Sequence, residues 1–344
     1  MSQIVLADGR LVKEYSTPYI IAEVNSSHNG NLEIAKKMID AAVLAKCDCV
    51  KFQSWSSSSL YSQSYYEKNP IAKKFVNKFS LASSQLKEMA DYCREKGIGF
   101  SSTPYSKEEV DFLVNECQVP FIKIGSMEIN NKDFLEYIAR KDIPVILSTG
   151  MAEMQEVDKA IRIFEELNNK NLVILHCVSI YPTPIESVNL NNILGLRERF
   201  TDYPIGFSDH TLGDEAAIAA TTLGAAVIEK HITLDSKMIG MDNQMAMEPA
   251  ELTNLVIRCH NISKAMGKKE RVLSEVEYKQ RDNMRRSIVT TRTLSKGHII
   301  TRDDLDFKRP GNGIPPEKIN DLIGKKINKD IECDTIIMES DLNK

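Results

Sequence analysis

Short runs of apolar and β-branched residues recur along the first two thirds of the chain, and each predicts a buried strand. Eight such runs lie at residues 19–23, 49–53, 99–102, 120–124, 145–148, 172–176, 204–207 and 226–230. Most of the segments between them carry apolar residues at helical spacing, as in 31–46 and 153–169. Continuously apolar strands that alternate with helices indicate a parallel sheet covered on both faces. Eight such units predict an α/β fold of the (β/α)8 TIM-barrel type.

An open, doubly wound sheet would share this local pattern and is the structural alternative. In a dinucleotide-binding sheet, a G-x-G-x-x-G turn follows the first strand and holds the phosphates. None of the eight runs is followed by such a turn. The sequence therefore favours the closed barrel.

The segments that flank the eight units predict additional structure. Residues 1–15 read as two short strands around Asp8 and Gly9, a hairpin that could close the bottom of the barrel. Residues 268–286 are charged and lack a strong apolar face, whereas short strands and turns begin at Ser287. We therefore predict a barrel domain with its hairpin over 1–270, a linker over 271–286 and a small β-rich domain over 287–344.

Composition excludes several classes of partner. The 344 residues carry a formal net charge of −4, without the basic excess that binds nucleic acid or an acidic membrane surface. The N-terminus lacks a secretory signal, and no apolar run approaches the ~20 residues needed to cross a bilayer. A cytoplasmic protein with no nucleic-acid or membrane partner is expected. The seven cysteines are scattered and lack zinc-site spacing, so reduced thiols are expected.

Polar residues gather where the predicted strands end, which in a TIM barrel is the mouth that holds the active site. These positions are Glu23, Lys51, Gln53, Ser102, Thr103, Lys123, Ser126, Ser148, Thr149, His176, Tyr181, Ser208, Asp209, His210, Lys230 and His231. Three lysines among several hydroxyls suit an anion with both a phosphate and a carboxylate. Each lysine alone could equally be a solvated side chain.

His210 and His231 follow the seventh and eighth strands, which are neighbours in a closed barrel. Two imidazoles on adjacent strands could bind one divalent metal ion and leave positions for water and substrate. His260 and His298 lie outside the strand ends and are expected to be ordinary hydrogen-bonded histidines, while His28 and His176 remain ambiguous.

Two carboxylates are candidates for general acid/base work. Glu23 ends the apolar run YIIAE, where an unpaired carboxylate would be costly, so it needs a lysine, a metal-bound water or a substrate hydroxyl as partner. Glu128, in KIGSMEINN, is of the same kind. A structural ion pair is the alternative for both, and spacing does not choose between them.

The motifs IIAEVNSSHNG, VKFQS, FSSTPYS, KIGSMEINN, ILSTGM, LHCVSIYPTP, IGFSDHT and EKHITLD occur in this order. Together they resemble the bacterial sialic acid synthases, or nonulosonate synthases. The C-terminal segment RRSIVTTRTLSKGHIITRDDLDFKRPGNGI resembles the antifreeze-like (SAF) domain that ends those enzymes. The resemblance covers nearly the whole chain.

This resemblance implies a metal-dependent transferase that condenses phosphoenolpyruvate with the open-chain aldehyde of an N-acetylated hexosamine, such as N-acetylmannosamine. The products would be a nine-carbon 2-keto sugar acid and phosphate. C3 of phosphoenolpyruvate would add to the aldehyde, water would add to C2, and the tetrahedral intermediate would expel phosphate. Mn²⁺ is the metal implied, with Mg²⁺ or Co²⁺ as alternatives.

The resemblance also implies roles for individual residues. His210 and His231 would hold the metal, and Glu23, or alternatively Glu128, would act as acid/base. The groups that bind phosphoenolpyruvate would be Lys51, Lys123, Ser126, Ser148 and Ser208. The sugar would be contacted by Gln53, Ser179, Tyr181, Asp242 and Arg309. Arg309 would enter the barrel of a partner subunit and take part in catalysis there, which implies a domain-swapped homodimer.

Two departures from the family pattern fall where the sugar is expected. Ser179 stands where the family commonly has asparagine, and GMDNQMAMEP replaces GPDHKASLEP while keeping Asp242. The identity of the sugar is therefore open, and a legionaminate or pseudaminate synthase acting on a diacetamido-trideoxyhexose is an alternative. A more distant one is a Schiff-base aldolase that uses Lys123 or Lys230. A non-enzymatic scaffold is disfavoured by the polar strand ends.

Overall fold

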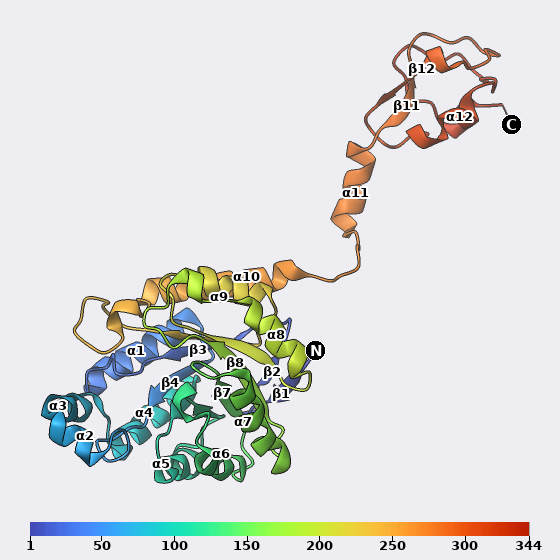
Figure 1. The fold of residues 1–344 in the computed structure, drawn as a ribbon. Coiled ribbons are helices and arrows are strands. Elements are labelled where there is room, and N and C mark those ends of the chain that lie inside the picture. Colours follow the sequence, from blue (N-terminus) through green and yellow to red (C-terminus); the bar gives the residue numbers. More distant parts are fainter. Residues whose placement is uncertain (344) are drawn as a thin grey trace. The chain divides into compact units, whose positions relative to one another are not determined.

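The structure is a computed structural model that describes residues 1–343. It divides into two compact units, Met1–Gly267 and Lys268–Lys344. The first unit contains the eight parallel strands of the predicted barrel, with helices around them (Figure 1). None of the helices in the described part of the chain is long and apolar enough to cross a membrane.

The strands follow the apolar runs of the sequence closely. They are β3 (Tyr19–Glu23), β4 (Cys49–Gln53), β5 (Gly99–Thr103), β6 (Ile122–Ile124), β7 (Val145–Ser148), β8 (Leu172–Cys177), β9 (Ile205–Asp209) and β10 (Val227–His231). Their order in the sheet is β5-β4-β3-β10-β9-β8-β7-β6, and neighbouring strands in this order pair in parallel. A hydrogen bond from Ser101 Oγ to the carbonyl of Phe121, 2.9 Å long, joins the two outer strands. The barrel is therefore nearly closed, and the predicted fold is confirmed.

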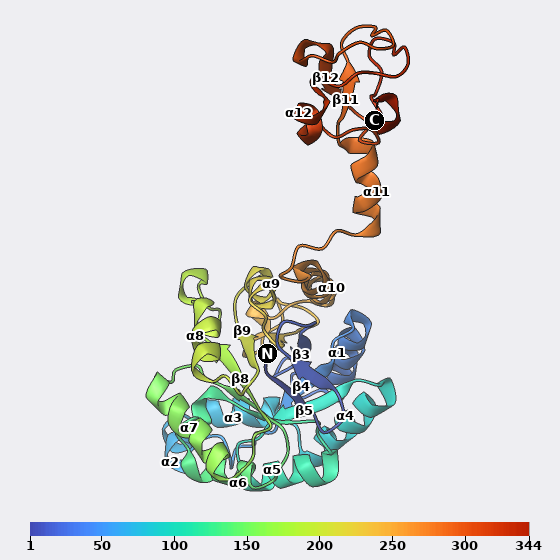
Figure 2. The same cartoon turned by 90° about the vertical axis from the view of Figure 1, so that its right-hand side faces the viewer.

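Helices surround this sheet as Figure 2 shows. They are α1 (Leu32–Ala45), α2 (Gln63–Lys68), α3 (Pro70–Phe79), α4 (Ser83–Lys96), α5 (Lys107–Phe112), α6 (Lys132–Ala139), α7 (Met154–Glu166), α8 (Asn191–Arg199), α9 (Glu215–Thr222) and α10 (Pro249–Met266). Each longer helix buries an apolar stripe against the strands; α7, for example, buries Val157, Ala160, Ile161 and Phe164. Residues on this stripe and the outward-facing strand residues form the main core.

The N-terminal hairpin pairs β1 (Gln3–Val5) with β2 (Leu11–Lys13) in antiparallel register. Its buried side chains Ile4, Leu6 and Val12 form one apolar cluster with inward-facing strand residues such as Ile21 and Phe121. The same cluster contains Tyr19, the first residue of β3, and Phe121 directly precedes β6, so the hairpin lies at the N-terminal ends of the strands, the bottom of the barrel. The opposite end is left open for the site.

The second unit begins with the exposed helix α11 (Glu275–Met284). It continues with β11 (Ser287–Thr290) and β12 (Leu305–Lys308), which pair antiparallel, and the short helix α12 (Ile319–Leu322). Its core is formed by Ile288, Leu294, Ile300, Leu305, Ile314, Leu322, Ile327, Ile331 and Ile337. This apolar cluster is far smaller than that of the barrel, so few interactions hold the unit together.

Candidate active site

A cavity of about 480 Å³ lies at the C-terminal ends of the barrel strands. The predicted site residues that line it are Glu23, Lys51, Gln53, Lys123, Ser126, Glu128, Ser148, Ser179, Tyr181, Ser208, His210, His231 and Asp242. The structure thus brings together every predicted site residue of the first unit. Arg309 lies in the second unit, where its side chain is exposed and contacts the sulfur of Met284.

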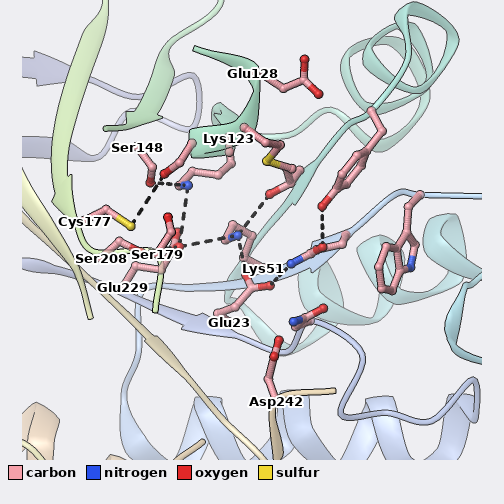
Figure 3. A pocket seen from close by; sticks show the side chains of 18 of the residues that line it. Glu23, Lys51, Lys123, Glu128, Ser148, Cys177, Ser179, Ser208, Glu229 and Asp242 are labelled. Atoms are coloured by element: carbon pink, nitrogen blue, oxygen red, sulfur yellow. Dashed lines mark hydrogen bonds and ion pairs between the residues drawn. The ribbon is translucent and has the colours of Figure 1, made fainter. Parts of the chain in front are cut away.

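Two lysines occupy the floor of the cavity, one on β4 and one on β6 (Figure 3). Lys51 forms an ion pair with Glu23 at 2.5 Å and donates a hydrogen bond to Thr103 Oγ1 at 3.1 Å. Lys123 donates to Ser148 Oγ at 2.8 Å. Both lysines and Glu23 are at least 97% buried. Ammonium groups enclosed in this way are desolvated and act strongly on an anion that enters.

Burial and charge shift the pKa values of these groups in different directions. Burial lowers the pKa of Lys123, and the nearby Glu229 only partly offsets it. For Lys51, burial is outweighed by Glu229 and Glu23, so its pKa is raised. Burial raises the pKa of Glu23 to about 7, against the attraction of Lys51. Glu23 can therefore exist in either protonation state near neutral pH, as acid/base work requires.

Hydroxyl groups line the wall beside the lysines. The backbone N–H of Gly150 donates to Ser126 Oγ at 2.9 Å. A Cβ atom at Gly150 would lie 2.8 Å from Ser126 Oγ and would also collide with Ser179 Oγ. Glycine at this position therefore lets the two hydroxyls approach closely beside Ser148. Together with the lysines, they form a cradle of donors suited to phosphate oxygens.

The other end of the cavity holds His210 and His231, whose ring centroids are 5.3 Å apart. The Nδ1 atom of His210 is 2.8 Å from the carbonyl of Val178, and this contact leaves Nε2 for another partner. The Nδ1 atom of His231 is buried and has no hydrogen-bond partner within residues 1–343. It lies 3.7 Å from Asp242 Oδ2. Burial also raises the pKa of Asp242 to about 6.

His210 and His231 have the chemistry of metal ligands. A buried imidazole nitrogen without a partner, next to a second imidazole, is what a divalent transition metal requires. Burial lowers the pKa of His231, which favours the neutral form that ligates metals. Within residues 1–343, no three His, Cys, Asp or Glu side chains form a ready-made metal cluster. The two histidines therefore fit an ion whose remaining positions stay open.

Gln53, Glu128 and Tyr181 lie around the cavity. Gln53 donates to Glu23 Oε1 at 3.2 Å and accepts from Tyr105 at 2.7 Å, so it fixes the orientation of Glu23. Glu128 is half-buried, accepts from Asn131 at 2.7 Å, and lies apart from the Glu23–Lys51 pair in Figure 3. Tyr181 is exposed at the rim, with its ring 4.3 Å from that of His210.

Five of the strand-end positions do not line the cavity, namely Ser102, Thr149, His176, Asp209 and Lys230. Lys230 does not line the cavity but forms a buried ion pair with Asp209 at 2.8 Å and donates to the carbonyl of Thr211. The reason is strand alternation: successive side chains of β10 point to opposite faces, so Glu229 and His231 face the barrel interior and Lys230 does not. The cavity therefore has two lysines from the strand ends rather than three.

The four remaining histidines lie outside this cavity. His176 contacts the carbonyl of Val188 through Nε2 at 2.6 Å, and His28 accepts a hydrogen bond from the N–H of Gly30. His298 pairs with Asp304 in the second unit. All seven cysteines are free thiols, and Cys333 alone among them is exposed.

Several cavity residues were missed from the sequence, among them Glu229, Trp55, Tyr105 and Cys177. Glu229 had a usable signal because it stands two positions before His231 on one strand and must share its face. Trp55 and Tyr105 lie in loops, whose course the local pattern does not predict.

Comparison with known proteins agrees with this geometry. Residues 38–271 match the NeuB family, and residues 285–343 match the SAF domain. The chain belongs to the NeuB family. The resemblance drawn from the sequence motifs is thereby confirmed, and the second unit contains a SAF domain.

Individual relatives span nearly the whole chain. N,N'-diacetyllegionaminic acid synthase of Campylobacter jejuni is 37% identical over 93% of this chain and 98% of its own length. Human N-acetylneuraminate-9-phosphate synthase is 35% identical over 98% of this chain and 96% of its own. The solved N-acetylneuraminic acid synthetase of Leptospira borgpetersenii has a TM-score of 0.74 and 32% identity, covering 81% of this chain and 95% of that one. NeuB relatives are thus synthases of sialic-acid-type sugars.

Proposed function

We propose that this NeuB-family chain condenses phosphoenolpyruvate with an open-chain N-acetylated hexosamine to give a nine-carbon 2-keto sugar acid and phosphate. The observation that carries this proposal is the floor of the cavity. Two fully enclosed lysines stand beside Ser126, Ser148 and Ser208, so a phosphate and a carboxylate would both find charged and neutral donors.

The histidine end supports binding of the aldehyde. His210 and His231 would hold a divalent ion, with Mn²⁺ the first candidate and Mg²⁺ or Co²⁺ the alternatives. Such an ion, when bound, polarises a carbonyl oxygen and so makes its carbon more electrophilic. Glu23, held by Gln53 and Lys51, would exchange a proton with the aldehyde oxygen as the new bond forms. Gln53, Ser179, Tyr181 and Asp242 would face the sugar.

A homodimer forms the second part of the proposal. Large apolar side chains are exposed in the segments that follow β6 to β10, namely Met127, Met151, Met154, Ile180, Tyr181, Ile185, Leu212, Ile239 and Met241. Apolar surface of this kind usually marks a contact with another protein surface. We infer that the SAF domain of a second copy covers it and presents Arg309 to the sugar.

The sugar itself is the finer question. The relatives named above are named for different products: one is an N,N'-diacetyllegionaminic acid synthase and another an N-acetylneuraminate-9-phosphate synthase. A diacetamido-trideoxyhexose is therefore tested alongside N-acetylmannosamine and its 6-phosphate. A Schiff-base aldolase remains a second candidate because burial lowers the pKa of Lys123, as such a nucleophile requires.

The experiment incubates the full chain with phosphoenolpyruvate, Mn²⁺ and each sugar in turn, and measures phosphate release and product mass. We expect phosphate only when both substrates are present, a product that contains the sugar plus the three carbons of pyruvate, and loss of turnover on chelation. Irreversible inactivation by borohydride in the presence of substrate, with Lys123 modified, would instead identify the aldolase.

A further inference from the structure

Glu229 is a buried carboxylate that the motifs did not single out, and it stands in the centre of the cavity floor. It lies on β10 with 3% of its surface exposed. One oxygen, Oε1, accepts a hydrogen bond from Ser208 at 3.1 Å. The same oxygen is 3.7 Å from the Nζ atoms of both Lys51 and Lys123. Figure 3 shows Glu229 between the two lysines.

The second oxygen of this carboxylate is unusual. Oε2 is buried and has no hydrogen-bond partner anywhere in the described chain. A buried charged oxygen left without a partner costs free energy, and such atoms in native proteins usually meet water or a ligand. Since Glu229 lines the cavity, a molecule bound there lies next to this carboxylate.

The charge of this oxygen limits what its partner can be. Phosphate and carboxylate oxygens of phosphoenolpyruvate would be repelled by Oε2 and attracted by the two lysines and the hydroxyl cradle. Apart from its phosphate and carboxylate groups, that substrate consists of the carbons C2 and C3, so these are what Oε2 would face. In the proposed condensation, C2 loses electron density when the C2=C3 electron pair forms the bond to the aldehyde carbon. Water then adds to C2, so this carbon is where an anion and a hydrogen-bond acceptor are useful.

We propose that Glu229 is a catalytic residue whose open Oε2 stabilises the positive charge developing at C2 and orients the water that adds to this carbon. This inference rests on the proposed function. The water oxygen bonds to C2. The bond between C2 and the oxygen that bridges to phosphorus then breaks, and phosphate leaves with that oxygen. One of the two water hydrogens ends on the new sugar hydroxyl and the other on phosphate, so atoms and charge balance. Preorganised electrostatic groups of this type contribute about 10²–10³ to kcat.

A purely structural role makes a different prediction. If Glu229 only held the two lysines in place, removing its charge would weaken binding of phosphoenolpyruvate and raise KM, while kcat at saturation would stay near that of the wild type. A group that acts in the transition state lowers kcat with little change in KM. The split between the two constants therefore separates the roles.

The test compares Glu229→Gln, which keeps the shape and removes the charge, with Glu229→Asp, which keeps the charge. Glu14→Gln is the matched control, because it removes a buried carboxylate that pairs with Arg197 and does not line the cavity. We expect Glu229→Gln to lower kcat about 10²–10³-fold with KM for phosphoenolpyruvate within about threefold. Glu229→Asp should recover at least about tenfold of the lost kcat, and Glu14→Gln should keep kcat per folded molecule.

A raised KM with kcat near the wild-type value in Glu229→Gln, or no change in either constant, would overturn the proposal. If circular dichroism shows that Glu229→Gln does not fold, the kcat and KM of Glu229→Asp are compared with those of the wild type instead, and the same two outcomes apply. Wild-type turnover is measured in the same assay. No phosphate release by the wild type with any sugar would refute the proposed function, whereas an active wild type with an unaffected Glu229→Gln variant would refute this inference alone.

Discussion

Both units of the chain bury carboxylates, but the two environments differ. In the second unit, Asp304 is enclosed and accepts hydrogen bonds of 2.7–2.8 Å from Thr301, His298 and Arg292. In the barrel, Glu229 is as deeply buried, yet one of its oxygens has no partner in the described chain. A saturated acid stabilises a fold, whereas an open one is free to meet a ligand. The contrast therefore separates structural acids from those of the site.

In its pKa, Glu229 resembles Asp304, because burial is outweighed by Lys123 and Lys51, which lower the pKa of Glu229. Glu23, the other buried acid of the cavity, differs from Asp304. Burial raises the pKa of Asp304, but hydrogen bonds from His298 and Thr301 outweigh it and hold the pKa well below its usual range. For Glu23, burial outweighs Lys51 and raises the pKa to about 7. By linkage, the ionised form of Asp304 stabilises its unit, whereas ionising Glu23 costs the barrel free energy. The barrel keeps this costly acid because the proposed chemistry uses it.

The sharpest test of the contrast is Glu23→Gln, for which the largest effect is expected. Loss of a general acid/base should lower kcat by about 10³-fold. Because a neutral amide avoids the cost of burying charge, the melting temperature at pH 8 should stay the same or rise. Phosphate release and calorimetry measure the two quantities. Glu95→Gln, on the exposed face of α4, should change neither. A melting temperature lowered by several degrees with kcat retained would make Glu23 a structural acid.

Histidines extend the comparison. His231 has an open nitrogen in the barrel, whereas His298 is paired with Asp304 at 2.8 Å. Replacing His210 and His231 by alanine should weaken metal binding by at least about 10²-fold, because both ligands that we propose are lost. Equilibrium dialysis with Mn²⁺ measures the stoichiometry. His298→Ala should bind metal as the wild type does. Unchanged stoichiometry in the double variant would exclude the histidine pair as the metal site.

In the second unit, Asp304→Asn should lower stability by about 3 kcal/mol, since it breaks a buried charged network. Amide hydrogen exchange over residues 287–343 measures this locally, while fluorescence of the chain's one tryptophan, Trp55, follows the barrel. The matched control is the exposed neighbour in Asp303→Asn, which should change little. Equal protection in both variants would show that Asp304 adds no stability.

The pH dependence of the second unit is expected to be smaller in size. The folded pKa of Asp304 lies below its unfolded value of about 3.9. Its stabilisation is therefore complete above that pH and decreases as pH falls through 4 toward 2. Exchange protection in the wild type should decline over this window, and the decline should be shallower in Asp304→Asn. Parallel declines in the two proteins would assign the acid sensitivity to other groups.

Much of the barrel could be predicted from the sequence because each strand is a continuous apolar run. The same local pattern does not show which side chains at the end of a strand point into the cavity. Lys230 was placed at the mouth and Glu229 was missed, although strand alternation alone separates them. Helices α2 and α3 were not predicted, since most of their residues are polar or exposed. Hydrogen bonds such as Gln53 to Glu23 join residues from different strands, and no sequence spacing encodes them.

The central claim, that the barrel mouth adds water to C2 of phosphoenolpyruvate, is tested most directly by an isotope label. Phosphoenolpyruvate carrying ¹⁸O in the bridge between C2 and phosphorus is turned over with the sugar that gives the highest rate. The account predicts that the released phosphate contains the label, because the C–O bond breaks. Label retained in the keto sugar acid, or no phosphate release at all, would contradict it.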